Sequence, residues 1–190
     1  MPSARDAALK SRWRTELARH RSVAAGVAAA AWDDLDTYDE DGIEDFEAAA
    51  APTIAAIRKR TATMTAGFLG KLTATPMVAM TDDELGLPDD WYRQPFMTHW
   101  AALAAGIAFE VAVERGRSRA EQVGTDGVTS AARDTAKVVD ANTERSFSWE
   151  RTPDPDACPW CTEVAGQLYN TAETADFGHD RCACDVTPAT

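Results

Sequence analysis

All four cysteines of this 190-residue chain lie between residues 158 and 184. Cys158 and Cys161 form a Cys-x-x-Cys pair, Cys182 and Cys184 form a Cys-x-Cys pair, and His179 shortly precedes the second pair. Two residues between cysteines let a tight turn present both sulfurs to one ion, and zinc takes nitrogen and sulfur ligands in a tetrahedron. A tail of about 40 residues buries too little apolar surface to hold a shape alone. The pattern therefore predicts a small C-terminal unit stapled through these five side chains.

Two kinds of staple fit the spacing. Cys158, Cys161, His179 and Cys182 complete a structural zinc site, with Cys184 as a rival fourth ligand. Two disulfides, formed once the protein leaves the reducing cytosol, are the alternative, and the cysteines allow more than one pairing. A redox-active Cys-Pro-Trp-Cys motif has less support, because such sites follow a buried strand and no strand pattern precedes this one.

Upstream of the tail, apolar residues recur at helical spacing and predict a mainly α fold. The length suits one core with a small appended module. We expect an elongated helical body over residues 1–148 and a small irregular Cys/His-stapled C-terminal module over residues 149–190. The expected helices span about 3–31, 43–72, 96–115 and 118–147.

The second of these helices carries an apolar stripe that repeats every seven residues from Ile43 to Met64. Such a stripe requires a partner helix, either within the chain or on another copy of it. Pro52 interrupts the pattern, because proline removes a backbone donor and clashes with the preceding turn. We therefore expect either a kink at Pro52 or a helix that begins near Ala51.

Residues 75–95 contain several prolines and are expected to be mostly loop. Within them, residues 81–84 have the form of a capping box, which predicts a single helical turn. Trp91, Tyr92 and Phe96 are expected to close the helical core.

Glycines set the expected boundaries of the last two helices. Arg115 and Gly116 place a base and a glycine where a helix commonly ends. Ser118 is suited to cap the following helix, and Gly127 marks a candidate break within it.

Charge is unevenly distributed in a chain whose net charge is -12. Residues 1–21 are mainly basic, whereas residues 33–47 carry nine acidic residues and no base. Both runs are typical of solvated faces, and the sharper interpretation is a basic arm that reaches for an acidic partner. The acidic total argues against broad binding to nucleic acid, so any DNA contact is expected from the 1–21 arm.

The chain shows no phosphate-binding loop, no HExxH, no GxSxG and no GxGxxG motif. We therefore expect no enzymatic activity and no small-molecule substrate. The charged N-terminus resembles no signal peptide, and the apolar runs are too short to span a membrane. His20 and His99 lie on helical faces and are expected to be ordinary structural residues.

The tail resembles the C-terminal signature of the Mu F-like phage head morphogenesis proteins, also called minor capsid proteins, of the type found in phages that infect actinobacteria. The matching segments are Trp149-Glu150-Arg151, Ala157-Cys158-Pro159-Trp160-Cys161, Ala165-Gly166, Leu168-Tyr169, Phe177, His179-Asp180-Arg181-Cys182-Ala183-Cys184 and Pro188. Residues 119–132 look like the helix that precedes this signature. Gly178 stands where many relatives have proline, and Ala183 stands where they often have arginine.

The resemblance implies a non-enzymatic virion component in the head interior or near the portal, made in the host cytoplasm during assembly. Its implied role is in head assembly and in DNA packaging or delivery, with portal and capsid proteins as partners and a homo-oligomer as a further expectation. The resemblance also implies that the five Cys and His side chains form one unit. The runner-up is a zinc-knuckle module that binds nucleic acid, which the acidity of residues 150–185 disfavours, and a CxxC thiol oxidoreductase has the least support.

Overall fold

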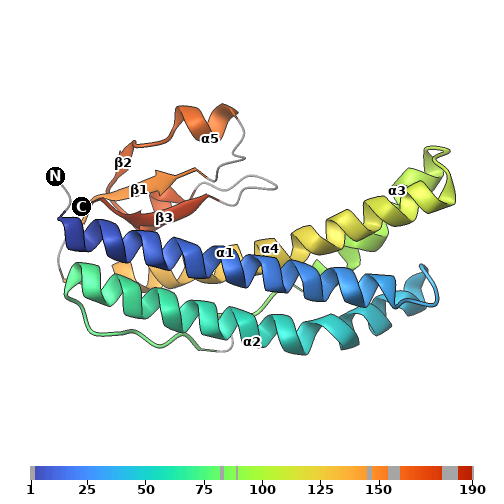
Figure 1. The fold of residues 1–190 in the computed structure, drawn as a ribbon, viewed down its shortest axis with the longest axis horizontal. Helices are drawn as coiled ribbons and strands as arrows, with labels where there is room; N and C mark the ends of the chain where they lie inside the picture. Colours follow the sequence, from blue (N-terminus) through green and yellow to red (C-terminus); the bar gives the residue numbers. More distant parts are fainter. Residues whose placement is uncertain are drawn as a thin grey trace.

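Four helices build an elongated bundle in this computed structural model, and a small sheet lies over one end of it (Figure 1). The structure describes residues 3–81, 84–88, 90–144, 147–153, 159–176 and 184–189. The helices are α1 (Ala4–Asp33), α2 (Glu40–Thr73), α3 (Gln94–Ala104) and α4 (Phe109–Ala141), with a short 3-10 turn, η1 (Trp91–Arg93), before α3. The predicted mainly α fold is confirmed.

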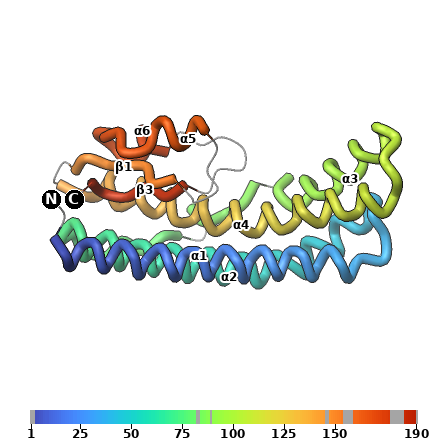
Figure 2. The backbone as a smooth tube through the Cα atoms, turned by 45° about the horizontal axis from the view of Figure 1, so that its top comes forward, coloured from blue at the N-terminus to red at the C-terminus, as the bar shows by residue number. Residues whose placement is uncertain are grey.

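The C-terminal part contains a three-stranded antiparallel sheet with the strand order β2-β1-β3. Its elements are β1 (Trp149–Thr152), α5 (Pro159–Glu163), β2 (Leu168–Tyr169), α6 (Ala172–Ala175) and β3 (Asp185–Pro188). Figure 2 shows this unit lying against the bundle at the end where the chain termini meet. We call residues 149–189 the C-terminal module; residues 154–158 and 177–183 lie outside its described part.

The module shares a hydrophobic core with the bundle. Trp149 of β1 and Val186 of β3 belong to the same buried cluster as Trp13 and Leu17 of α1 and Val128 of α4. A continuous core therefore joins the module to the helices. The division of the chain into two domains stays a prediction.

α1 and α4 approach each other closely through glycine. A Cβ built on Gly124 would lie 2.4 Å from the carbonyl oxygen of Ala24, and one on Gly116 would lie 2.2 Å from the Trp32 ring. No larger side chain fits there without displacement, because atoms at these distances overlap. Gly116, which was expected to end a helix, is therefore a packing position, and so is Gly124.

The expected helices 96–115 and 118–147 are wrong in their boundaries. α3 ends at Ala104, and Gly106 in the following turn has φ of 77°, a conformation that favours glycine. α4 then runs unbroken from Phe109 through Gly127, where a break was a candidate.

α2 begins at Glu40 and contains Pro52, so the expected start near Ala51 is wrong. Asp39 caps this helix, since its side chain accepts from the backbone amides of Asp41 and Gly42. Pro52 lies on the exposed face, where water can satisfy the carbonyl that the missing N–H leaves without its helical partner.

The apolar stripe of α2 packs within the chain, because α2 contacts both α1 and α4 and buries Ile54 and Ile57. The aromatic closure is confirmed: Phe46 of α2 makes ring contacts with Tyr92 and Phe96. The capping box is also confirmed, since the Glu84 amide donates to Thr81 Oγ1 and the Thr81 amide donates to Glu84 Oε2.

Candidate functional site

The structure places two of the five predicted Cys/His residues and leaves three outside its described part. Cys161 is buried in α5, and Cys184 is buried immediately before β3. Cys158, His179 and Cys182 lie outside the described residues. Within the described ranges, no three His, Cys, Asp or Glu side chains gather as metal ligands. Zinc therefore stays a prediction, as do the two disulfides.

Pairing of β1 with β3 joins the two ends of the module. Trp149 pairs with Pro188 and Thr152 pairs with Asp185, so the backbone at Cys184 is held beside the end of β1. Arg133 of α4 donates to the Cys184 carbonyl from Nε at 3.2 Å and from Nη2 at 2.9 Å. A bundle helix therefore anchors the backbone of a candidate ligand.

Asp185 is a buried carboxylate surrounded by cations from the bundle. Its Oδ1 accepts from Arg21 at 2.9 Å, and its Oδ2 lies 3.7 Å from Arg14 Nε. Burial raises the pKa of Asp185 above its ordinary value, while the charges of Arg21, Arg14 and Arg133 oppose that rise. The contact is thus a desolvated ion cluster between α1 and β3.

A second carboxylate, Asp176 after α6, contacts α4. It lies 2.7 Å from Lys137 Nζ and 3.4 Å from Arg133 Nη1. Burial lowers the pKa of Lys137, but the hydrogen bond and charge of Asp176, together with Asp134, raise it overall. Lys137 is therefore held in its charged form against the module.

Asp140 of α4 reverses this arrangement, because here the bundle supplies the carboxylate. Its Oδ1 accepts from Trp149 Nε1 at 2.8 Å, and its Oδ2 accepts from the backbone amide of Ala172 at 2.8 Å. One side chain thus positions both β1 and the first turn of α6.

The basic N-terminal run supplies the remaining contacts. Lys10 Nζ donates to Glu150 Oε1 at 2.8 Å and to the Pro188 carbonyl at 2.7 Å, and Arg14 donates to Thr152 Oγ1 at 2.7 Å. With Arg21, three basic residues of the 1–21 run therefore contact the module of their own chain. Arg5, Arg12 and Arg19 remain exposed.

Inside the module, a buried arginine links the strand to both short helices. Arg151 is 1% exposed, and its guanidinium carbon lies 6.0 Å from the centroid of the Trp160 ring of α5. Its Nη1 donates to the Ala175 carbonyl of α6 at 3.5 Å. The Trp-Glu-Arg segment thus places its arginine in the interior of the unit.

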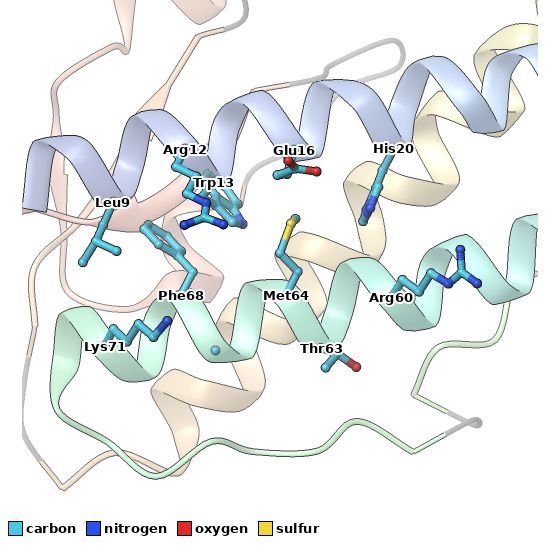
Figure 3. A pocket seen from close by; sticks show the side chains of 11 residues that line it. Leu9, Arg12, Trp13, Glu16, His20, Arg60, Thr63, Met64, Phe68 and Lys71 are labelled. Carbon is cyan, nitrogen blue, oxygen red and sulfur yellow. The ribbon is translucent and has the colours of Figure 1, made fainter.

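Sequence reasoning missed a groove of about 540 Å³ between α1 and α2 (Figure 3). Trp13 and Phe68 stack there with ring centroids 4.8 Å apart, and Met64 lies beside them. Arg12, Arg60, Lys71, Glu16 and His20 also line the groove. No pattern in the sequence pairs the two helix faces, because the residues that meet lie on separate elements.

His20 is a structural residue in this groove. Its Nδ1 lies 2.8 Å from Thr61 Oγ1. Burial, followed by the charge of Arg19, lowers the pKa of His20. The expectation for His99 is also met, since it is buried against the rings of Trp32 and Tyr38.

Comparison with known proteins gives one family and no named relative. Among the described residues, no helix has an apolar stretch long enough to span a membrane. No curated protein and no solved structure matches the chain. The model of the VG15 protein family matches residues 2–190. The chain therefore belongs to the VG15 protein family, a family of phage gene products.

Proposed function

We propose that this chain is a non-enzymatic virion protein of the Mu F-like minor capsid type, which acts in head assembly and in the packaging or delivery of DNA. The phage family match along residues 2–190 supports the proposal. The observation that carries it is that the tail signature residues around Trp149 and Cys184 belong to one unit, through the β1–β3 pairing, and that this unit is anchored on long helices. A unit held in one orientation on an elongated bundle suits docking to other virion proteins.

The proposed partners are the portal and capsid proteins, and the proposed location is the head interior or the portal region. Three half-buried carboxylates support a structural role, because Asp140, Asp176 and Asp185 are each engaged in contacts between module and bundle. Such contacts preserve the orientation of the module during docking.

An infection experiment tests this function. We expect a phage that lacks the gene to yield few filled heads, and wild-type protein supplied from a plasmid to restore them. The protein should also co-purify with virions and cross-link to the portal. Gly26→Ala is the matched control, since Gly26 lies on an open face of α1 and its change should complement fully. Absence of the protein from virions, with normal particle yield after deletion, would overturn the proposal.

We also propose structural zinc as the cofactor, held by Cys158, Cys161, His179 and Cys182, with Cys184 as the alternative fourth ligand. The donor set suits zinc, and burial of Cys161 and Cys184 would shield bound thiolates from solvent. Bound zinc and accessible thiols should be measured on protein purified from a reducing cytosol without added metal. About one zinc per chain, released by a chelator as thiols appear, is the expected result. Protein with neither zinc nor thiols would instead assign two disulfides.

We also propose that the N-terminal arm contacts DNA, through those of its basic residues that do not bind the module. Lys10, Arg14 and Arg21 are engaged with the module, so Arg5, Arg12 and Arg19 are the exposed arginines of the arm left for phosphate. Glutamate at Arg5, Arg12 and Arg19 should abolish salt-dependent retention of the full chain on duplex DNA. Retention that is equal in the wild type and this variant would remove DNA from the list of partners.

A further inference from the structure

The groove between α1 and α2 and the far end of the bundle carry opposite charge. The groove between α1 and α2 lies toward the end that holds the chain termini, since it is lined by residues 9–20 and 60–71. Arg12, Arg60 and Lys71 supply three cations there against the single carboxylate of Glu16. In a chain of net charge -12, this groove is therefore a local site for a negative partner.

The floor of the groove is apolar. Trp13 and Phe68 stack with their planes 7° apart, and Leu9 and Met64 pack against the same cluster. A partner with acidic side chains alone would leave this floor uncovered, so a fitting partner combines acidic and apolar side chains.

The opposite end of the bundle has both properties. It contains the turn from the end of α1 to the start of α2 (Figure 1). Arg117 pairs with Asp33 and Arg93 pairs with Glu40. Further carboxylates of this end are exposed: Asp34, Asp36, Asp41, Glu44, Asp45 and Glu47.

Large apolar side chains are exposed at the same end, in and beside the turn between α3 and α4. Met97, Leu103, Phe109 and Val111 are 37% to 53% exposed. The Tyr38 ring, in the α1–α2 turn, lies 6.0 Å from the Phe109 ring, so the acidic turn and the apolar residues are neighbours. We call this surface the acidic end.

We propose that the α1–α2 groove binds the acidic end of a second copy of this chain. Charge complementarity selects this occupant, because each molecule carries a basic groove with an apolar floor and, at its other end, acidic residues beside exposed apolar side chains. The two surfaces differ, so each contact leaves one groove and one acidic end open. Contacts of this kind build head-to-tail rings or filaments rather than a closed symmetric dimer. The inference needs only the purified chain and does not rest on the proposed function.

Two variants, each with one of the two surfaces disrupted, test the contact. The groove variant combines Arg60→Glu with Lys71→Glu, and the end variant combines Glu44→Lys with Glu47→Lys. All four side chains are exposed, so folding should be retained, and circular dichroism checks this. Sedimentation velocity over a concentration series measures association of the wild type, of each variant and of their equimolar mixture.

The wild type should associate as its concentration rises, and each variant alone should associate at least about tenfold more weakly. The mixture should form heterodimers at concentrations where each variant alone is monomeric, because one intact groove meets one intact acidic end. A control with Arg5→Glu and Arg19→Glu carries the same charge change outside the groove lining and should associate like the wild type. High salt should weaken the wild-type contact, because exposed charges are screened.

Several results would overturn the proposal. These are a wild type that stays monomeric at its highest soluble concentration, a mixture that stays monomeric, or single variants that associate like the wild type. A labelled DNA duplex added to the same sedimentation runs tests whether nucleic acid, and not a second copy, binds in the groove. Duplex binding that the groove variant alone loses would assign the groove to nucleic acid instead of a second copy.

Discussion

The α1–α4 interface and the interface between the C-terminal module and the bundle are held by different physical means. α1 and α4 pack closely because glycine has no side chain. Gly124 leaves room for the backbone of Ala24, and Gly116 leaves room for the Trp32 ring. The module meets the bundle partly through a shared apolar core and partly through carboxylates such as Asp185, which ion pairs and hydrogen bonds satisfy. The first interface depends on shape and the second also depends on charge.

This difference sets how each interface should respond to change. The close contacts at Gly124 and Gly116 should be sensitive to added volume and insensitive to protonation, because the atoms that meet there belong to the backbone and to the Trp32 ring. An interface with buried carboxylates is sensitive to loss of one partner and to pH, because an unpaired buried polar group keeps its desolvation cost.

The largest expected effect comes from adding volume between α1 and α4. Gly124→Val would place a Cβ against backbone atoms of Ala24, and we expect a loss of about 3 kcal/mol in the free energy of unfolding. Gly26→Ala is the control, because Gly26 has no neighbour within 4 Å and alanine there should stabilise the helix by about 1 kcal/mol. Urea unfolding measures both. Equal stability of the two variants would show that the helices do not approach so closely.

Loss of one polar partner should act on the module. Asp140→Ala leaves the indole N–H of Trp149 and the backbone amide of Ala172 without their acceptor, which should cost about 2 kcal/mol. Limited proteolysis should then cut the module faster while the bundle fragment persists. Asp134→Ala is the matched control, since its pair with Lys137 is partly exposed and worth roughly 0.5 kcal/mol. Equal cleavage of both variants would place the anchoring elsewhere.

A change of pH should also distinguish the two interfaces, with a smaller effect on stability than these substitutions. The pKa of Asp185 is raised in the folded chain, so the folded state binds more protons than the unfolded state between the ordinary and the raised pKa. The contribution of Asp185 to stability should therefore be largest at low pH and decline as the pH rises through that window. Urea unfolding of the wild type and of Asp185→Asn across this range measures it. A wild-type advantage that grows with pH would mean that Arg14 and Arg21 outweigh burial.

The smallest expected effect concerns an ion pair that lies outside both interfaces. Glu40 and Arg93 pair at the exposed acidic end, so a double-mutant cycle with alanine should give a coupling below about 1 kcal/mol. A coupling as large as the effect of Asp140→Ala would remove the distinction between surface and interface charges.

Much of the helical body could be predicted from local pattern. α1 and α2 begin and end within three residues of the expected bounds, because apolar periodicity and capping residues act over a few positions. The Thr81 turn and the aromatic closure at Phe96 follow from the same local chemistry.

The glycines of α4 show where local pattern failed. Gly116 and Gly127 looked like an end and a break, since glycine weakens a helix by about 1 kcal/mol relative to alanine. In the fold, Gly116 faces Trp32, more than 80 positions away in sequence, and packing offsets the local cost. The helix boundary moves instead to Gly106, whose positive φ requires a turn.

The candidate site divides in the same way. The clustering of Cys161 and Cys184 in one C-terminal module was evident from spacing alone, and both are buried in that module. The partners of the module were not evident, because Lys10 meets Glu150 140 positions away and Arg21 meets Asp185 164 positions away.

The sequence by itself determined the helical class, the approximate bounds of α1 and α2 and the grouping of cysteines in the tail, because these depend on neighbours along the chain. Only the tertiary structure decided which glycines admit another helix, which basic residues hold the module and where the groove forms. Each of these depends on side chains from distant segments that meet only when the helices pack. The charge and volume that meet at such contacts cannot be recognised from the sequence of one helix or strand alone.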